Sequence, residues 1–328
     1  MTVPLPELLA TARVVSLPLA TRFRGIDTRE ALLLRGPFGW TEFSPFVEYD
    51  DAESAAWLAA ALDFGWRELT LPANAPGRIR VNATMPAVSA DRVEAVLARF
   101  PGCRTIKVKV AERGQSLADD IARVERAREL LGPDGRIRLD ANGGWNVDEA
   151  EHAIHALGKF DLEYVEQPCA TVDELAQIRK RVKYMGIPIA ADESVRKAED
   201  PLAVARAKAA DILIIKVQPL GGIERALRII EDAGLPVVVS SALDTSVGLS
   251  MGAYLSASLP FIDYDFGLGT AALLTADVTD VPLVPRDGQI DVRRIDVSED
   301  LLDEYAAPAD RTRWWLDRLT RVHAQLPD

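Results

Sequence analysis

Short apolar stretches alternate with amphipathic stretches of helical periodicity along most of the chain, from about residue 81 onward. Eight apolar stretches predict strands, at residues 80–82, 105–109, 137–140, 162–166, 189–192, 212–216, 237–240 and 261–263. Between them, Ser116-x-x-Asp119 and Thr171-x-x-Glu174 have the spacing of helix-capping boxes, and a third helix is predicted over residues 222–232. A strand and a helix in every ~25 residues indicate right-handed βαβ units and a parallel sheet.

Eight such units that close on themselves form a (β/α)8-type barrel, for which about 200 residues are enough. The alternative for alternating strands and helices is a doubly wound sheet, which typically carries a Gly-x-Gly-x-x-Gly loop after its first strand. The chain contains no such loop. We therefore predict an α/β fold with a modified (β/α)8 barrel of the TIM type over residues 81–270.

The first eighty residues follow a different pattern. Strand-like pieces alternate with turns between residues 31 and 45, and a helical stretch follows at 52–62. Residues 72–77 are rich in proline and glycine, which indicates a linker between two domains. We predict a small α+β domain over residues 1–80, and a C-terminal segment, 271–328, that packs back on it.

Composition narrows the classes of partner. The 38 lysines and arginines against 50 aspartates and glutamates give a net charge of −12, which would repel a phosphate backbone, so we expect no nucleic-acid partner. No apolar run approaches the ~20 residues that span a bilayer, and the N-terminus does not resemble a secretory signal. Two cysteines in 328 residues favour reduced thiols and a cytoplasmic location. The oligomeric state cannot be predicted, because barrel helices and interfaces share the same apolar patterning.

Charged residues stand at the ends of five consecutive predicted strands: Lys109, Asp140, Glu166, Asp192 and Lys216. Catalytic groups of such barrels project from the carboxyl ends of the strands. Three carboxylates that converge there would oppose each other's ionisation, and a divalent cation would relieve this repulsion. An all-oxygen ligand set favours Mg²⁺ over Zn²⁺.

The lysines point to proton transfer. Lys107 and Lys109 share one face of their strand, and we expect that face to point inward, because outward positions contact the apolar helix layer. Lys216 ends an apolar strand. We expect the pKa values of these lysines to be lowered, as a general base near neutral pH requires. A metal-bound carboxylate substrate has an acidified α-proton, which one lysine would remove while the other stabilises the intermediate or returns a proton.

These residues resemble the enolase superfamily, and in particular its muconate lactonizing enzyme subgroup. The motifs that carry the resemblance are Lys107-Val-Lys109, Arg138-Leu-Asp-Ala-Asn142, Glu166-Gln-Pro168, Asp192-Glu-Ser194 and Lys216. The resemblance implies that Asp140, Glu166 and Asp192 bind Mg²⁺, with Mn²⁺ as a possible substitute. It also implies that Lys109 and Lys216 form the acid/base pair, with Lys107 in support.

Further stretches, at residues 39–46, 81–84, 216–222, 240–248 and 267–270, resemble the o-succinylbenzoate synthase family of menaquinone biosynthesis. That family consists of hydro-lyases that act on a small carboxylic acid, 2-succinyl-6-hydroxy-2,4-cyclohexadiene-1-carboxylate, by syn elimination of water. The resemblance implies that Lys109 removes the α-proton and then protonates the departing hydroxyl. Lys216 would stabilise the enediolate from the opposite face.

The same resemblance suggests residues around the reacting atoms. Arg138 matches a position that supports the site electrostatically. The candidates for substrate contact are Asn142, Gly222, Ser240 and Ser241. The N-terminal domain caps the barrel mouth in the family, so the loop at residues 22–25 is expected to touch the substrate.

Other functions remain open. Asp263-Tyr-Asp265 is an Asp-x-Asp pattern with which dipeptide epimerases of the same subgroup bind a substrate ammonium, although an Asp that caps a turn is the simpler interpretation. Racemisation also needs two lysines, so the pair does not separate a synthase from an N-succinylamino acid racemase. A Schiff-base aldolase would use Lys216 but gives the carboxylates no role. A non-catalytic barrel would not need the complete set of carboxylates and lysines.

Overall fold

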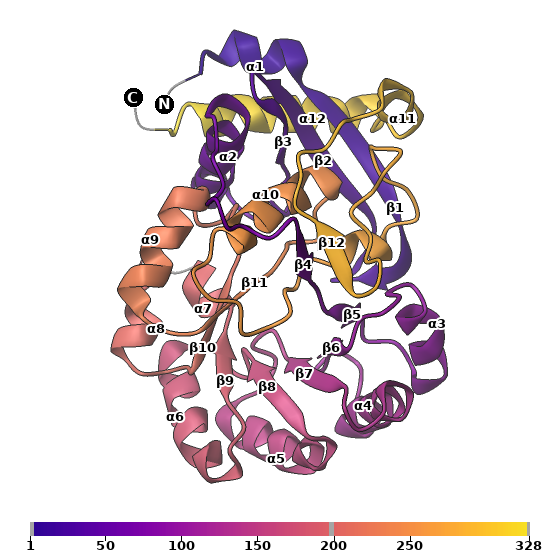
Figure 1. The fold of residues 1–328 in the computed structure, drawn as a ribbon, viewed down its shortest axis with the longest axis vertical. Helices are drawn as coiled ribbons and strands as arrows, with labels where there is room; N and C mark the ends of the chain where they lie inside the picture. Colours follow the sequence, from indigo (N-terminus) through magenta and orange to yellow (C-terminus); the bar gives the residue numbers. More distant parts are fainter. Residues whose placement is uncertain (1–2, 197–199, 327–328) are drawn as a thin grey trace.

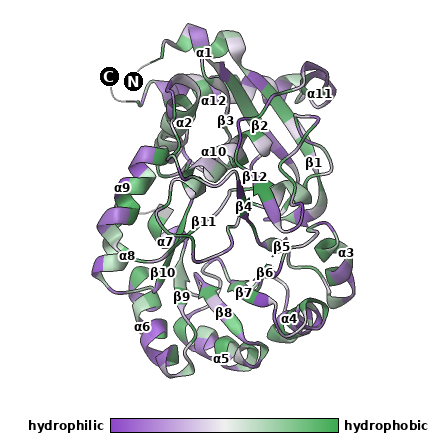
Figure 2. Ribbon diagram, viewed as in Figure 1, coloured by the Kyte–Doolittle hydropathy of each residue, from purple (hydrophilic) through white to green (hydrophobic). Residues whose placement is uncertain are grey.

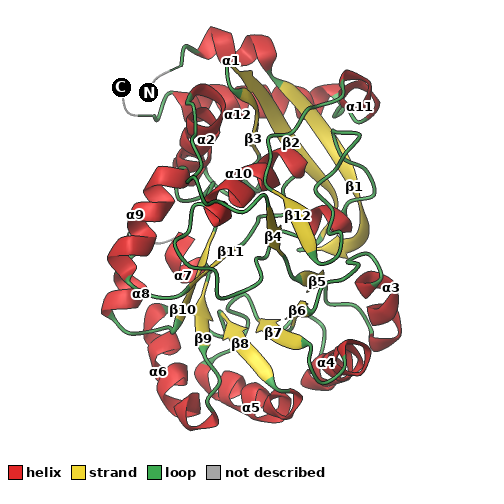
Figure 3. Cartoon of the chain, viewed as in Figure 1, coloured by secondary structure: helices red, strands yellow, loops and turns green. Residues whose placement is uncertain are grey.

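The structure is a computed structural model that describes residues 3–196 and 200–326. Figure 1 shows an antiparallel sheet with its helices at one end of the molecule, and parallel strands with helices outside them at the other. Figure 3 shows the same arrangement by secondary structure, with the helices around the barrel strands. The two parts meet at the carboxyl ends of the parallel strands, where charged residues gather.

The antiparallel sheet, called here the capping sheet, has the strand order β1-β2-β3. Its strands are β1 Arg13–Phe23, β2 Ile26–Gly36 and β3 Gly39–Phe43. Arg24 and Gly25, with φ of 50° and 78°, make the tight turn between β1 and β2. The helices beside this sheet are α1 Leu5–Thr11, α2 Asp51–Trp66 and α12 Ala309–His323.

Seven strands form a parallel sheet in the order β5-β6-β7-β8-β9-β10-β11. Their bounds are Ala83–Met85, Thr105–Lys109, Arg136–Asp140, Leu162–Glu166, Ile189–Ala191, Ile212–Ile215 and Val237–Val239. Phe266 and Gly267 join the two edges of this sheet: the N–H of Asn82 donates to the Phe266 carbonyl and the N–H of Gly267 to the Val239 carbonyl, each at 2.8 Å. The strands therefore curl into a barrel, which confirms the predicted fold class.

Helices cover the outside of the barrel, and several of the longer ones begin with side-chain caps. The barrel helices are α3 Val93–Leu97, α4 Leu117–Leu131, α5 Val147–Leu157, α6 Val172–Val182, α7 Glu193–Arg196, α8 Ala203–Arg206, α9 Ile223–Ala233 and α10 Ser246–Ala257. The capping boxes predicted at Ser116 and Thr171 are both formed, so these two helix starts are confirmed. A further α-helix is α11 Glu299–Glu304, and β4 Arg78–Arg80 pairs antiparallel with β12 Gln289–Asp291. Short 3₁₀ helices lie at Ala90–Arg92, Gly158–Phe160, Lys183–Met185 and Thr270–Leu273.

Two of the eight predicted strands are wrong. Arg80 belongs to β4, which pairs with β12, and the next apolar residues, Ala83–Met85, enter the barrel instead. Residues 261–263 form no strand and the Phe261 side chain is 79% exposed, so Phe266 and Gly267 fill the eighth position. An apolar run of two or three residues does not distinguish a buried strand from an exposed loop.

The interior is apolar where the sheet contacts the helices. Every residue of β9 and β10 is buried, and Figure 2 shows these strands in hydrophobic colours, while α5, α6 and α9 carry both hydrophobic and hydrophilic residues. This is the pattern of a parallel sheet covered by amphipathic helices. Within residues 3–196 and 200–326, no helix combines the length and apolar character needed to cross a membrane.

Candidate active site

Three carboxylates lie where consecutive barrel strands end. Asp140 and Glu166 are the last residues of β7 and β8, and Asp192 directly follows β9. Asp140 lies beside Glu166 in the strand register, and all three residues have a relative exposure of 0%. Because parallel strands end at the same edge of a barrel, the three side chains lie in one region.

Two lysines of β6 contact these carboxylates. Lys107 Nζ lies 2.8 Å from Glu166 Oε1 and 3.1 Å from Asp140 Oδ2, so it bridges the two acids. Lys109 Nζ lies 2.6 Å from Asp140 Oδ2. The structure thus places both lysines on the inner face of β6, where they compensate buried negative charge.

Burial and neighbouring charges shift the pKa values of this cluster. Burial and the negative charge of Asp140 raise the pKa of Glu166 to about 8. Burial opposes the ionisation of Asp140 as well, but Lys109 and Lys107 outweigh it and hold the pKa of that carboxyl well below its usual range. Burial likewise opposes the charge of Lys107, yet Glu166 and Asp140 raise its pKa well above the usual value. The predicted lowering of the lysine pKa values is therefore wrong for Lys107.

The donor chemistry of this centre fits a divalent cation. Asp140, Glu166 and Asp192 offer only oxygen ligands, which hard cations such as Mg²⁺ prefer. Three buried carboxyl groups ionise together only with positive charge nearby, and here lysine ammonium groups supply part of it. Among the described residues, no three His, Cys, Asp or Glu side chains form a ready-made metal cluster, and the Lys107 ammonium contacts both Asp140 and Glu166.

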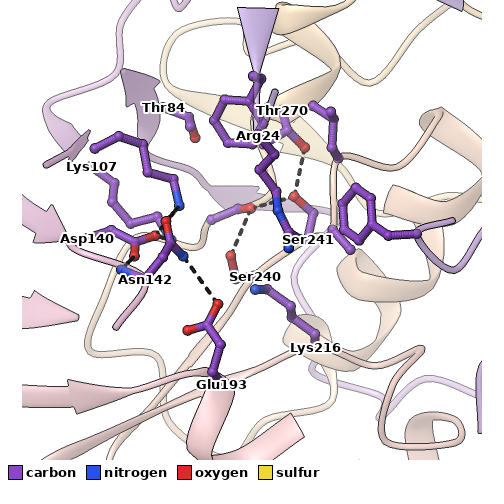
Figure 4. A pocket seen from close by; sticks show the side chains of 16 residues that line it. Arg24, Thr84, Lys107, Asp140, Asn142, Glu193, Lys216, Ser240, Ser241 and Thr270 are labelled. Atoms are coloured by element: carbon purple, nitrogen blue, oxygen red, sulfur yellow. Dashed lines mark hydrogen bonds and ion pairs between the residues drawn. The ribbon is translucent and has the colours of Figure 1, made fainter. Parts of the chain in front are cut away.

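A cavity opens beside the carboxylates, and Figure 4 shows its lining side chains. Asp140 and Asn142 lie on one side, Lys216 lies on the other, and Ser240 lies between them. Lys109 Nζ is 2.6 Å from both Asp140 Oδ2 and Asn142 Oδ1. The ammonium groups of Lys109 and Lys216 therefore stand on opposite sides of the cavity.

Asp192 and the segment that follows it are held by Gln167. The Gln167 Oε1 atom accepts hydrogen bonds from the backbone N–H groups of Asp192 (2.9 Å) and Ser194 (3.2 Å). Lys216 Nζ lies 2.5 Å from Asp192 Oδ2. This pairing fixes Lys216 at the cavity wall, as Asp140 fixes Lys109 on the other side.

The capping sheet contributes the outer wall of the cavity. Phe23 and Arg24, at the β1–β2 turn, line it together with Phe46. Lys109 Nζ lies 5.5 Å from the centre of the Phe23 ring, and the Arg24 guanidinium lies 4.1 Å from that of Phe46. The structure thus brings part of the predicted loop, residues 22–25, to the cavity.

Three of the four predicted substrate contacts line the cavity: Asn142, Ser240 and Ser241. Gly222 does not. It precedes α9 and faces α2, where an added Cβ would lie 2.9 Å from Asp63 Oδ2. Gly222 therefore permits close packing of the barrel against helix α2.

Arg138 and Asp265 lie away from the cavity lining. Arg138 is fully buried and donates hydrogen bonds to Asn82 Oδ1 (3.0 Å) and to the Asp265 carbonyl (2.7 Å). The Asp265 side chain accepts a hydrogen bond from Thr105 Oγ1, at the start of β6 and so at the opposite end of the strand from Lys109. Asp263 is exposed. The Asp-x-Asp pattern is not part of the cavity.

Several lining residues were not singled out from the sequence. They are Phe46, Thr84, Glu193, Ala242, Leu243, Gly267 and Thr270. Each lies inside one of the motifs that carry the family resemblance, so the motifs held the signal. Glu193, for example, accepts a hydrogen bond from Asn142 Nδ2 at 3.2 Å, as Figure 4 shows, and Ser241 and Thr270 share one of 2.7 Å.

Comparison with known proteins agrees with this architecture. Residues 89–295 match the family described as enolase C-terminal domain-like, and residues 14–65 match enolase N-terminal domain-like. An o-succinylbenzoate synthase of Thermobifida fusca is 56% identical, over 90% of this chain and 91% of that protein. One of Mycolicibacterium smegmatis is 53% identical, over 98% of this chain and 97% of that protein. The chain belongs to the o-succinylbenzoate synthase family.

This membership confirms the resemblance predicted from the motifs. The o-succinylbenzoate synthase family consists of metal-dependent lyases of the enolase superfamily, so the chain is an enzyme. Among solved structures, muconate lactonizing enzyme from Pseudomonas putida superposes with a TM-score of 0.74 at 20% identity, over 90% of this chain and 98% of that one. At that identity the likeness supports the fold alone.

Proposed function

We propose that the chain catalyses the syn elimination of water from 2-succinyl-6-hydroxy-2,4-cyclohexadiene-1-carboxylate, giving o-succinylbenzoate for menaquinone biosynthesis. The observation that carries this proposal is the placement of Lys109 and Lys216 on opposite sides of one cavity, beside three buried carboxylates. It occurs in a chain that is 56% identical to a curated o-succinylbenzoate synthase.

Lys109 carries the proton in both halves of this elimination. Its neutral Nζ removes the α-proton of the substrate carboxylate, and the electrons of the C–H bond delocalise into an enediolate. The enediolate then expels the β-hydroxyl, which takes the proton from Lys109 and leaves as water on the same face. Lys216 stays charged on the other face and stabilises the negative charge that develops.

The cation in this proposal is Mg²⁺, with Mn²⁺ as a substitute, held by Asp140, Glu166 and Asp192. A bound divalent cation supplies charge that stabilises a carboxylate whose α-proton is being removed. Lys107 stays protonated between Asp140 and Glu166, because both acids raise its pKa. Its role is to hold these two ligands in place.

Polar groups around the cavity orient the substrate. Ser240 and Ser241 offer hydroxyl groups to the succinyl carboxylate, and Asn142 orients the Lys109 ammonium through its 2.6 Å contact. Arg138 supports the site through its positive charge within the barrel. The substrate is a small molecule, the enzyme works in the cytoplasm, and nucleic acid is not a partner.

The alternative functions receive less support. Asp265 contacts Thr105 at the far end of β6, so it is not available to bind the ammonium of a dipeptide in the cavity. A Schiff-base mechanism would use Lys216 but gives no role to the three buried carboxylates beside the cavity. Racemisation of N-succinylamino acids would use the same two lysines, so only an activity assay distinguishes a racemase from a synthase.

The test is a spectrophotometric assay that follows the loss of the diene absorbance of the substrate in the presence of Mg²⁺. We expect rapid turnover by the wild type. In Lys109→Ala we expect kcat to fall by about 10²- to 10⁴-fold, the usual contribution of a general base. Lys180→Ala, an exposed lysine of α6, is the matched control and should retain full activity. Absence of elimination, together with solvent deuterium entering the α-position of N-succinylamino acids, would establish the racemase instead.

The metal is tested without turnover. We expect Mg²⁺ to raise the thermal midpoint of unfolding of the chelator-treated protein, because a ligand that binds only the folded state stabilises it. Asp192→Asn should reduce this rise. An equal rise in the variant would exclude Asp192 from the binding site.

A further inference from the structure

A buried ion pair on α4 holds the backbone around Lys109. Arg123 Nη1 lies 2.8 Å from Asp120 Oδ1, and the two side chains are 0% and 3% exposed. Arg123 Nη1 also donates a hydrogen bond to the Lys109 carbonyl at 2.8 Å. The backbone N–H of Ala111 donates one to Asp120 Oδ2 at 3.0 Å. The pair therefore contacts the chain at Lys109 itself and two residues later.

The turn that follows Lys109 needs such support. Ala111 has a φ of 60°, in the left-handed region that a residue with a Cβ adopts only at an energetic cost. Its N–H group is satisfied by Asp120, on a helix that packs against the barrel. Without this contact, the Ala111 backbone could relax to an extended conformation and move the end of β6.

Arg123 also ties β6 to the segment after β5. Its Nε donates to the Val88 carbonyl at 2.5 Å, and its Nη2 donates to Gln115 Oε1. Gln115 in turn donates to the Ala87 carbonyl at 2.7 Å. One buried guanidinium thus holds three segments around the strand end that carries Lys109.

A buried ion pair contributes little net stability, since desolvation offsets the attraction between the charges. The backbone groups that this pair contacts, in contrast, are the Lys109 carbonyl and the Ala111 N–H, both at the end of the strand that carries the base. We infer that Asp120 and Arg123 are positioning residues for Lys109, which fix its backbone so that Nζ meets the substrate α-proton. This inference rests on the proposed function, in which Lys109 is the base.

Helix α4 provides a matched control. Arg128, five residues after Arg123, also donates to backbone carbonyls, those of Gly132 (2.9 Å), Gly135 (2.6 Å) and Phe160 (2.8 Å). These acceptors lie at the opposite end of α4 from Lys109. Replacing either arginine removes several hydrogen bonds to carbonyl groups, but only Arg123 touches the backbone of the base.

The experiment compares Arg123→Gln, Asp120→Asn and Arg128→Gln in the Mg²⁺-supported assay, with thermal midpoints measured for each. We expect Arg123→Gln to lower kcat by about 10- to 100-fold with KM within about threefold, because displacing a base by ~1 Å costs rate rather than binding. Asp120→Asn should lower kcat in the same way, by a smaller factor. Arg128→Gln should lower the thermal midpoint but change kcat less than threefold.

Equal losses of kcat in Arg123→Gln and Arg128→Gln would overturn the inference. So would an Arg123→Gln variant in which only KM changes and kcat does not. If Arg123→Gln does not fold, Asp120→Asn decides: an unchanged kcat overturns the inference and a selective loss of kcat supports it. Lys109→Ala is measured alongside. Full activity of Lys109→Ala would mean that the proposed function has failed. If Lys109→Ala is inactive but Arg123→Gln and Arg128→Gln lose kcat equally, only the positioning role is overturned.

Discussion

Arg138 brings a positive charge into the barrel interior, two residues before Asp140 on the same face of β7. Its relative exposure is 0%, and its guanidinium lies 4.9 Å from the centre of the Tyr164 ring. It also pairs with Glu163, whose side chain is 15% exposed. A buried charge with several acceptors makes each of those acceptors depend on it.

Arg138→Met should therefore destabilise the protein strongly. We expect a loss of ~3–5 kcal/mol in the free energy of unfolding, because the change leaves Glu163 and the buried acceptor Asn82 Oδ1 without their donor. The matched control is Arg136→Met on the same strand. Arg136 also faces Glu163, at 3.6 Å, but its side chain is 48% exposed, so its loss should cost less than ~1 kcal/mol. Urea unfolding measures both, and similar losses would contradict the prediction.

Some residues of the candidate site could be predicted from the sequence pattern and others could not. Asp140 and Glu166 were predictable because each ends an apolar strand, and parallel strands present their ends together. Phe46 lies in an irregular segment and Thr270 begins a short 3₁₀ helix, Thr270–Leu273; the path of both segments depends on how the capping sheet packs on the barrel. Periodicity carries no information on that packing, so only the family motifs pointed to them.

At the scale of elements, side-chain caps fix the starts of four barrel helices, α4, α5, α6 and α10. Asn146 accepts hydrogen bonds from the N–H groups of Asp148 and Glu149, each at 3.0 Å, and the Glu149 side chain accepts one from the Asn146 N–H. This box was missed because an amide replaces the hydroxyl of the Ser or Thr motif. The strand predicted at residues 261–263 failed because apolar residues can also lie in an exposed loop, and here Phe261 and Ile262 are 79% and 37% exposed.

Removal of this cap should destabilise α5 without affecting catalysis. Asn146→Ala is expected to lower the free energy of unfolding by ~1 kcal/mol, because two backbone N–H groups lose their acceptor. His152→Ala, an exposed position of the same helix, is the control and should change stability by less than ~0.5 kcal/mol. Chemical denaturation measures the two variants, and kcat should match the wild type in both. A loss of kcat in Asn146→Ala would show that the helix start also supports the site.

At the scale of the whole molecule, buried polar groups join the capping sheet to the barrel. Glu42 of β3 accepts hydrogen bonds from the N–H and hydroxyl groups of Thr245 (3.1 and 2.6 Å) and from the N–H of Gly248 (3.0 Å). Arg29 of β2 donates to the Leu243 carbonyl at 3.0 Å. Leu243 lines the cavity, so the same contacts that hold the two parts together also form one wall of the site.

This junction makes stability depend on pH. Burial and the negative charge of Asp244 raise the pKa of Glu42 to about 7, against the opposing charge of Arg29. Between the unfolded pKa of about 4.5 and the folded value, the folded state keeps a proton that the unfolded state loses, so this group's contribution to stability falls as pH rises from about 4.5 to about 7. Burial raises the pKa of Asp244 as well, which acts in the same direction.

Glu42→Gln should remove most of this dependence, because the amide keeps an acceptor for Thr245 and Gly248 but does not ionise. We expect the free energy of unfolding of the variant to increase relative to that of the wild type from pH 5 to pH 7.5, so the variant becomes the relatively more stable protein. Glu30→Gln is the control: burial opposes ionisation of Glu30, but Arg311 and Trp315 hold its pKa below the usual value. Since Glu30 then stays ionised in both states across most of that range, its difference from the wild type should be nearly constant. Urea unfolding at several pH values measures both, and a constant difference for Glu42→Gln would show that Glu42 is ionised throughout in the folded protein.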